Sequence, residues 1–416
     1  MILEDEYNVI IAGAGPAGAS ASIFLSQAGI KHLLIDKAEF PRDKVCGDAL
    51  SGKVLSHLKH AIPDVAAQFA KNQEDYLPSY GVRFVAPNGK QADIPFLPNI
   101  TKDSPPPGFI SKRIYFDNFL YNHTASDFAI RISNAELKDI EKKNDIIELQ
   151  IKIGETIYHT KTKVLIGADG ERGISHKYVS GGSKRNLEAF SAGIRAYYSG
   201  VTGYHDMNYI ELHFLPEILP GYFWIFPMAN GISNVGLGIL SSEVSKHHLN
   251  LKKIFNDIIN LPQFKERFAN AKPESPIQGW GLPLGNKYVK RSTDNVILTG
   301  DAANLIDPFT GEGIGNAILS GRYAAYAAIK ALENNIYTEV FFKENYDNII
   351  KQKVGHELKV GSTLLRLCRY KFLFNFVVNK AARNKEFRDT ISCMFANIDL
   401  RSKFGNPMFY LRMLFG

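Results

Sequence analysis

Short apolar runs followed by small-residue turns recur along the chain, and they predict an α/β fold. The runs lie at residues 9–12, 32–35, 163–167 and 295–298, and each ends at or near a glycine or an aspartate. Runs of this length are typical of buried strands. Helical stretches at residues 19–27 and 313–332 follow two of them. This order predicts strand–turn–helix units built around a mainly parallel sheet.

A second pattern occupies the middle of the chain. Four stretches there favour an antiparallel sheet, at residues 190–198, 208–214, 221–227 and 234–240. Further strands are predicted at 80–85, 91–94, 130–137 and 146–153, and helices at 113–126 and 250–268. Residues after about 335 are predicted to be wholly helical.

These patterns predict an α/β domain that is discontinuous in sequence. Its segments are residues 1–75, 105–180 and 285–335. The antiparallel sheet, from 76–104 and 181–284, forms a substrate domain. Residues 336–416 form a C-terminal helical region.

The first strand–turn–helix unit carries the strongest chemical signal. The turn is GAGPAG, residues 13–18, and the second strand ends at Asp36. Gly13 allows a tight turn, Gly15 lets a pyrophosphate approach the backbone, and Gly18 lets helix and strand pack closely. Asp36 is placed to accept hydrogen bonds from an adenosine ribose. The complete context predicts a bound dinucleotide.

A second glycine-rich loop follows the last buried strand, in the sequence VILTGDAANLIDPFTGEGIGNA at 296–317. Asp301 ends the strand, and the loop with Pro308, Gly311 and Gly313 enters a helix at Ile314. A helix N-terminus binds negative ligand groups. Two such sites in one domain suit a long dinucleotide, so we predict FAD rather than NAD.

Two other motifs admit both a functional and a structural interpretation. The sequence FPRDKVCG places Arg42, Cys46 and Gly47 after Asp36, where they could lie near a flavin or form an ordinary loop. The sequence PGYFWIFP puts Tyr222, Trp224 and Phe226 on one face of a strand. Strand aromatics are mostly core residues, so both interpretations of this strand stay open.

Composition excludes several classes of protein. The chain has 416 residues and three cysteines, too few for a disulfide framework, and no metal site is predicted. The N-terminus is acidic, so we expect no secretory signal. The chain has no apolar run of about 20 residues, so we expect no spanning helix. We therefore expect a cytoplasmic protein.

The basic charge is concentrated near the C-terminus. Residues 351–416 hold 13 Lys/Arg and 4 Asp/Glu, an excess of nine that leaves the rest at −2 against the total of +7. This distribution argues against nucleic acid as a partner. Apolar clusters lie among these charges at 364–367, 372–378 and 409–415. They predict peripheral contact with the inner membrane face, or a cap on the core with a solvated basic face.

Taken in order, the motifs GAGPAG, PRDKVCG, GYFWIFP and GDAANLIDPFTGEGI resemble those of the geranylgeranyl reductase family. That family belongs to the flavoprotein superfamily of p-hydroxybenzoate hydroxylase. The resemblance covers about residues 5–330, and no motif in the later tail matches. It implies a Rossmann-like FAD-binding domain of the glutathione reductase or p-hydroxybenzoate hydroxylase type.

The resemblance also implies residue roles. Cys46, Tyr222 and Trp224 would be catalytic, and Tyr222, Trp224, Phe226 and Pro227 would line an apolar tunnel for a prenyl chain. The residues that would hold FAD are Gly13, Gly15, Ala17, Gly18, Asp36, Lys37, Arg42, Cys46, Gly47, Arg113, Leu137, Asp301, Pro308, Gly311, Gly313 and Ile314.

The implied function is the saturation of carbon–carbon double bonds of an isoprenoid lipid by an FAD-dependent reductase. The electron donor is NAD(P)H or ferredoxin, since no second dinucleotide fingerprint appears. The proton donor stays open among Cys46, Tyr222 and water.

Two rival functions remain at this point. The first is a flavin monooxygenase or halogenase acting on an aromatic or polyene substrate, because fold does not decide function. Halogenases tend to carry a second tryptophan where this chain has Tyr222. The other is a non-catalytic FAD-binding or lipid-carrier protein. Oxygen dependence and a reducible flavin would separate them.

Overall fold

The computed structural model describes residues 3–182, 186–385 and 388. Two of the sequence features, Cys393 and the apolar segment 409–415, lie outside the described residues. The chain divides into two compact units. Unit 1 comprises residues 1–44, 113–189 and 282–362, and unit 2 comprises 45–112, 190–281 and 363–416.

Unit 1 is built around an eight-stranded sheet with a parallel centre. Its strand order is β18-β19-β11-β1-β2-β8, with β10 and β9 joined antiparallel at β11. Neighbours from β19 to β8 are parallel. Its strands are β1 (Glu6–Ala12), β2 (His32–Ile35), β8 (Ala129–Ile132), β9 (Ala135–Lys143), β10 (Ile146–Ile153), β11 (Thr156–Gly167), β18 (Ser292–Thr293) and β19 (Val296–Leu298).

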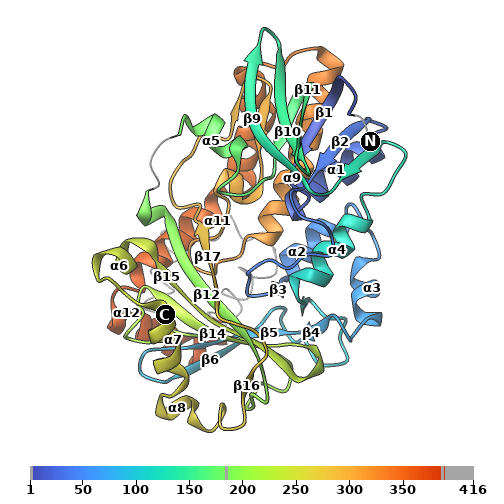
Figure 1. Cartoon of the computed structure of the whole chain (residues 1–416). Helices are drawn as coiled ribbons and strands as arrows, with labels where there is room; N and C mark the ends of the chain where they lie inside the picture. Colours follow the sequence, from blue (N-terminus) through green and yellow to red (C-terminus); the bar gives the residue numbers. More distant parts are fainter. Residues whose placement is uncertain (1–2, 183–185, 386–387, 389–416) are drawn as a thin grey trace. The chain divides into compact units, whose positions relative to one another are not determined.

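Helices connect and cover these strands (Figure 1). They are α1 (Pro16–Gln27), α4 (Arg113–Asn122), α5 (Ile174–Ser180), α9 (Ile314–Asn334), α10 (Glu339–Phe342) and α11 (Asn348–Leu367), whose last residues are assigned to unit 2, with short helical turns η1 (Leu187–Ala189), η3 (Gly300–Ala303) and η4 (Lys343–Asp347). The predicted α/β class is confirmed.

Unit 2 contains a second, mainly antiparallel eight-stranded sheet. Its order is β16-β12-β15-β14-β13-β5-β6, with β17 paired to β12. These strands are β5 (Gly81–Val85), β6 (Gln91–Pro95), β12 (Phe190–Ser199), β13 (Ile210–His213), β14 (Gly221–Pro227), β15 (Ile232–Leu240), β16 (Lys272–Pro273) and β17 (Gln278–Pro283). The β13–β5 pair is parallel, an exception to the antiparallel pattern that the sequence predicted.

A small three-stranded sheet and several helices complete unit 2. The sheet has the order β3-β7-β4, from β3 (Ala49–Leu50), β4 (Leu77–Ser79) and β7 (Gly108–Ile110). The helical elements are α2 (Gly52–Leu58), α3 (Val65–Lys71), η2 (Ala229–Gly231), α6 (Ser241–Lys246), α7 (Leu251–Ile259), α8 (Pro262–Lys265) and α12 (Lys371–Arg383).

The boundaries of the units differ from the expected domains. Residues 45–75 and 105–112, expected in the dinucleotide domain, cluster with unit 2. The reason is strand pairing, since β3 and β4 both pair with β7 within this unit. The loop that carries Cys46 therefore belongs to the same unit as the aromatic strand β14.

Two predicted elements are divided in the structure. The strand predicted at 130–137 is two strands, because Asn134 has a left-handed φ of +55° that ends β8 before β9 begins. The helix predicted at 250–268 ends at Ile259, and α8 restarts at Pro262. A proline cannot continue a helix that precedes it, but suits a first helical position.

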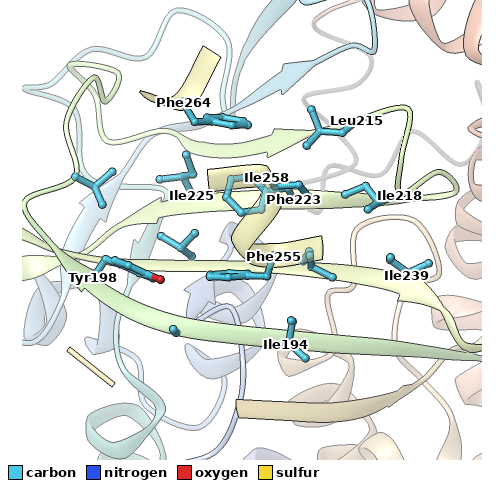
Figure 2. Close-up of a cluster of buried hydrophobic side chains, with 14 residues drawn as sticks. Ile194, Tyr198, Leu215, Ile218, Phe223, Ile225, Ile239, Phe255, Ile258 and Phe264 are labelled. Atoms are coloured by element: carbon cyan, nitrogen blue, oxygen red, sulfur yellow. The ribbon is translucent and has the colours of Figure 1, made fainter. Parts of the chain in front are cut away.

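One face of the unit 2 sheet holds a buried apolar core, drawn in Figure 2. Phe223 and Ile225 of β14 project into it and meet Phe255 of α7 and Phe264 of α8. Because side chains alternate along a strand, Tyr222, Trp224 and Phe226 lie on the opposite face. The core therefore fixes which face β14 offers to a ligand.

A buried ion pair lies beside this core. The Arg267 guanidinium donates to both oxygens of Glu211, at 2.6 and 3.0 Å, and His213 Nε2 lies 3.0 Å from the same carboxylate. Burial raises the pKa of Glu211, but the hydrogen bonds from His213 and Arg267 outweigh it, and the pKa lies below its ordinary value. The carboxylate is thus ionised in the native state at neutral pH.

Replacing Arg267 by Gln should lower the free energy of unfolding by about 3 kcal/mol at pH 7, because an uncompensated buried charge remains. A depressed native pKa contributes stability above the unfolded pKa and loses it as pH falls. The gap to wild type should therefore be present at pH 7 and narrow as the pH falls below 4.5, the ordinary pKa of glutamate. Denaturant titrations at each pH measure this difference in the free energy of unfolding. Lys253→Gln, which breaks an exposed pair with Asp257, is the control, and an equal loss there would contradict the prediction.

Candidate functional site

The first turn of α1 in unit 1 has the geometry that a phosphate group requires. Gly13 has a φ of +100°, and a Cβ there would lie 2.3 Å from the Ala168 oxygen. A Cβ on Gly18 would lie 1.8 Å from the Gly13 oxygen. At Gly15, in contrast, the nearest atom within 4 Å is Arg42 Nη2 at 3.6 Å. Two glycines are needed for packing, and the third leaves open space over the helix N-terminus.

Asp36 lies at the end of β2, as the sequence predicted, and its carboxylate is held firmly. It accepts from the Ala14 amide at 2.7 Å and the Ala38 amide at 2.9 Å. Each oxygen keeps a second lone pair, so the carboxylate can still bind a hydroxyl group. Lys37 is exposed beside it, and Leu137 is buried in β9.

Arg42 is held over the α1 N-terminus by a buried carboxylate. Asp117 accepts from Arg42 Nη1 at 2.7 Å and from Arg113 Nε and Nη2 at 2.6 and 2.8 Å. Burial raises the pKa of Asp117, but the two guanidinium groups outweigh it, so the pKa lies below its usual range. Arg42, expected on the flavin side, thus lies beside Gly15, where a pyrophosphate would approach. The sequence analysis missed Asp117, although the i, i+4 spacing from Arg113 could have indicated it.

The second predicted loop lies against the same helix. A Cβ on Gly300 would lie 3.1 Å from Ala17 Cβ and 3.3 Å from Ala317 Cβ. The first turns of α1 and α9 therefore both touch Gly300, the residue before Asp301. Gly313 is the N-cap of α9, and neither helix has a side-chain cap or an acidic residue in its first turn. Two uncompensated helix N-termini thus converge near one aspartate.

Asp301 faces this convergence. Its carboxylate lies 3.4 Å from Lys44 Nζ, and a Cβ on Gly313 would lie 3.7 Å from its Oδ1. Gly311 adopts φ +72° in the turn between Pro308 and α9, and Ile314 is buried. The predicted residues of both loops are therefore brought together within unit 1.

Asp169 is a further buried carboxyl group that the sequence analysis missed. It follows β11, and its Oδ2 accepts from the Ser175 amide at 3.0 Å in the first turn of α5. A Cβ on Gly173 would lie 2.1 Å from its Oδ1, so a glycine is needed there. Burial raises the pKa of Asp169 to about 6. The sequence GADG after a strand was the available signal.

Tyr222, Trp224 and Phe226 of unit 2 form one aromatic surface on β14. Neighbouring ring centroids lie 6.1 and 6.2 Å apart. Gly236 of β15 pairs with Trp224, and a Cβ there would lie 2.2 Å from the indole. Trp224 and Phe226 are buried, whereas Tyr222 is half-buried. Glycine on the neighbouring strand therefore lets the indole lie flat against the sheet.

The cysteine–glycine motif lies against this aromatic surface. A Cβ on Gly47 would lie 3.0 Å from Phe226 Cε2, and the Cys46 oxygen accepts from Asn234 Nδ2 at 2.7 Å. Cys46 is partly exposed. Two motifs separated by more than 170 residues thus meet within unit 2, and Asn234, which joins them, was missed from sequence.

The residues of unit 1 fit FAD. Open space over Gly15, the Arg42 guanidinium, Asp36 and two free helix N-termini match a ligand with a ribose, a pyrophosphate and a second polar chain.

Comparison with known proteins also indicates an FAD-binding protein. The chain matches the FAD binding domain family over residues 6–334. It is therefore a flavoprotein of the FAD-binding domain family, and FAD is its cofactor.

The comparisons identify a narrower family within this class. A digeranylgeranylglycerophospholipid reductase from Methanococcus vannielii is 30% identical over 387 residues, 92% of this chain and 88% of that protein. Another, from Methanosphaera stadtmanae, is 31% identical over 358 residues, 85% of each. A menaquinone reductase from Mycobacterium tuberculosis is 29% identical over 78% of this chain and 77% of its own length. The chain belongs to the digeranylgeranylglycerophospholipid reductase family and is an FAD-dependent oxidoreductase.

Solved structures share the fold at lower identity. A geranylgeranyl bacteriochlorophyll reductase-like protein from Thermoplasma acidophilum has a TM-score of 0.79 at 22% identity, covering 96% of this chain and 99% of that one. A triple mutant of a flavin-dependent brominase has a TM-score of 0.75 at 18% identity, covering 98% and 99%. The fold alone therefore does not separate reductases from halogenases.

Replacing Gly15 by Val should abolish FAD binding without unfolding the protein. Its φ of −66° is open to any residue, but a side chain would fill the space over the helix N-terminus. We expect affinity to fall by about a hundredfold or more, since a pyrophosphate site is lost. Flavin fluorescence titration of the apoprotein measures this. Gly13→Ala is the comparison and should lower the melting temperature instead, and unchanged FAD affinity in Gly15→Val would contradict the assignment.

Proposed function

We propose that this protein saturates carbon–carbon double bonds of the isoprenoid chain of a lipid or a quinone. The observation that carries the proposal is the aromatic surface of β14, joined to the Cys46–Gly47 loop in unit 2. Long apolar chains bind by burying surface against such rings. Relatives named for the reduction of digeranylgeranyl phospholipids and of menaquinone support an isoprenoid substrate.

Each group in the proposal has a defined task. Once reduced by an electron donor, FAD held by unit 1 would supply hydride for one alkene carbon and return to its oxidised form, and a proton must reach the other carbon. Arg42, Asp36 and the α1 and α9 N-termini bind and orient the cofactor. Trp224 and Phe226 hold the isoprenoid chain and exclude water, which an unactivated alkene requires. Cys46 and Tyr222 carry exchangeable protons among the residues that we place at the substrate site.

Anaerobic turnover tests the proposal. The dithionite-reduced protein, incubated without oxygen with a digeranylgeranyl glycerophospholipid or with menaquinone, should give products that gain two hydrogens per reduced bond in mass spectrometry. Parallel reactions with NADH, NADPH or reduced ferredoxin identify the donor. A strict requirement for oxygen, with oxygen or halogen in the product, would favour the monooxygenase or halogenase function and contradict ours.

Trp224→Ala should weaken binding of long prenyl substrates by about 1–3 kcal/mol, the value of an aromatic contact surface. Short prenyl analogues, which cannot reach along β14, should lose less. Dissociation constants for a series of chain lengths measure this difference. Phe223→Ala, which removes a ring from the opposite face of the same strand, should instead lower the melting temperature. Equal losses for all chain lengths in Trp224→Ala would show that the indole is only core.

We further propose that α12 contacts a membrane surface, which would give the enzyme access to a water-insoluble substrate. Phe374, Val378 and Ala381 face the protein, whereas Phe372 and Phe376, one helical turn apart, are 70% and 45% exposed. Residues 363–385 include six Lys/Arg and no Asp/Glu. Exposed aromatics within a basic segment suit an anionic lipid surface. In the described residues, no helix is both long and apolar enough to cross a bilayer.

Liposome co-sedimentation tests this contact. Wild type should sediment with vesicles that contain phosphatidylglycerol, and less with rising salt, because part of the attraction is electrostatic. Phe372→Ser combined with Phe376→Ser should reduce binding by about tenfold or more. Tyr288→Ser, which removes an aromatic residue 73% exposed in unit 1, should not. No sedimentation of wild type at low salt would overturn the proposal.

A further inference from the structure

Asn234 of β15 is a polar residue on the face of the sheet opposite the apolar core, where it pairs with Phe226 of β14. It is fully buried, and its strand neighbours Val235, Leu237 and Ile239 belong to the apolar core. A buried amide is costly unless its donors and acceptor are used. The side chain must therefore serve the residues that it contacts.

The Asn234 amide makes three hydrogen bonds to two different segments of unit 2, strand β14 and the loop at residues 46–48. Its Oδ1 accepts from the Trp224 indole at 2.8 Å. Its Nδ2 donates to the Cys46 carbonyl oxygen at 2.7 Å and to Asp48 Oδ2 at 2.8 Å. Both amide hydrogens are thus used, and the oxygen has its partner. One planar group fixes the indole on one side and the cysteine loop on the other.

Asp48 extends this arrangement to a neighbouring strand. Its Oδ2 also accepts from the Tyr197 hydroxyl at 2.7 Å, and its backbone oxygen accepts from the Ser111 amide at 3.0 Å. Asp48 adopts a left-handed φ of +68°, which costs free energy unless surrounding contacts hold it. The Cys46–Asp48 turn is therefore held by side chains of β12 and β15 together with the backbone hydrogen bond from Ser111.

We propose that Asn234 is a positioning residue that holds Cys46 and Trp224 in one fixed arrangement at the substrate site. This inference rests on the proposed function for its catalytic meaning, since it concerns the surface that the isoprenoid chain would contact. The arrangement itself is a property of unit 2 and does not depend on which lipid is reduced.

An aliphatic residue at 234 would leave three groups without this partner. Asn234→Leu keeps a similar side-chain volume. It removes the hydrogen bonds to the indole N–H and the Cys46 carbonyl oxygen, and one of those that Asp48 accepts. The loop should then open more often, while the apolar core on the other face of the sheet stays intact. The test is the reactivity of the Cys46 thiol in the full-length holoprotein.

Alkylation by iodoacetamide, followed by peptide mass spectrometry, measures each cysteine separately. In Asn234→Leu the rate at Cys46 should rise about fivefold or more, the factor that one lost hydrogen bond implies. Cys368, which is buried, should stay unreactive and so reports on global unfolding. Tryptophan emission should shift to longer wavelength, because Trp224 is one of only two tryptophans.

Ser233→Ala is the matched control. Ser233 is also fully buried on β15, but its hydroxyl pairs with that of Tyr204. This substitution removes a neighbouring hydrogen bond and should leave Cys46 reactivity unchanged. An equal rise in Ser233→Ala, or no rise in Asn234→Leu with an unchanged emission spectrum, would overturn the proposal.

A second variant covers the case in which Asn234→Leu unfolds and Cys368 also reacts. Trp224→Phe keeps an aromatic ring but removes the indole N–H and part of the ring, and it leaves the Asn234 bonds to Cys46 and Asp48 in place. It should raise Cys46 alkylation by a smaller factor, about twofold, and an unchanged rate would overturn the proposal. Turnover provides the functional test. Asn234→Leu should lower kcat on the isoprenoid substrate while FAD affinity stays at the wild-type value. If no isoprenoid is reduced by wild type, the proposed function fails, but the alkylation result still decides the role of Asn234.

Discussion

The close packing of α1 against α9 is the constraint on which the structure of unit 1 depends. A Cβ on Gly321 would lie 2.0 Å from the Ala17 oxygen, and the Ser20 hydroxyl donates to the Ile318 oxygen at 2.8 Å. Only small residues permit two helix backbones to approach this closely. Because Ala17 and Ala317, in the first turns of α1 and α9, both lie against Gly300, two helix N-termini lie near Asp301. A larger side chain at this contact would separate the two positive poles that suit a dinucleotide.

Two buried carboxyl groups of unit 1 illustrate how neighbours decide the charge state. Burial alone would raise the pKa of both. Asp117 has two guanidinium partners, and its pKa falls. Asp169 accepts chiefly from a backbone amide, and burial raises its pKa to about 6. Asp117 therefore serves as a permanent anion that holds Arg42 in place, whereas Asp169 lies close to its protonation midpoint under mildly acidic conditions.

Unit 2 carries the aromatic surface and the cysteine loop on which the proposed substrate site rests. Its sheet has an apolar core on one face, drawn in Figure 2. The alternation of side chains along β14 puts the aromatic surface on the other face. The loop that carries Cys46 belongs to unit 2 and not to unit 1. Since reductases and halogenases share the fold, the strand order alone does not decide the chemistry.

The sequence by itself determined the α/β class, the position of the glycine-rich turn and the alternation of β14. These features depend on local properties: backbone freedom at Gly13, the period of two in a strand, and apolar runs that cannot remain exposed. Sequence patterns also predicted most strands. They did not predict the end of β8 before Asn134 or the start of a new helix, α8, at Pro262.

Only the tertiary structure decided which distant residues meet. Asp117 is one polar residue of a helix in the sequence, and Asn234 one polar residue in an apolar strand. Their roles depend on partners 75 and 188 residues away, namely Arg42 and Cys46. Local propensity carries no information about such pairs, because a buried hydrogen bond is fixed by the packing of whole elements. The sequence therefore determined the cofactor class, and the tertiary structure decided which side chains lie together where the cofactor and the substrate are proposed to bind.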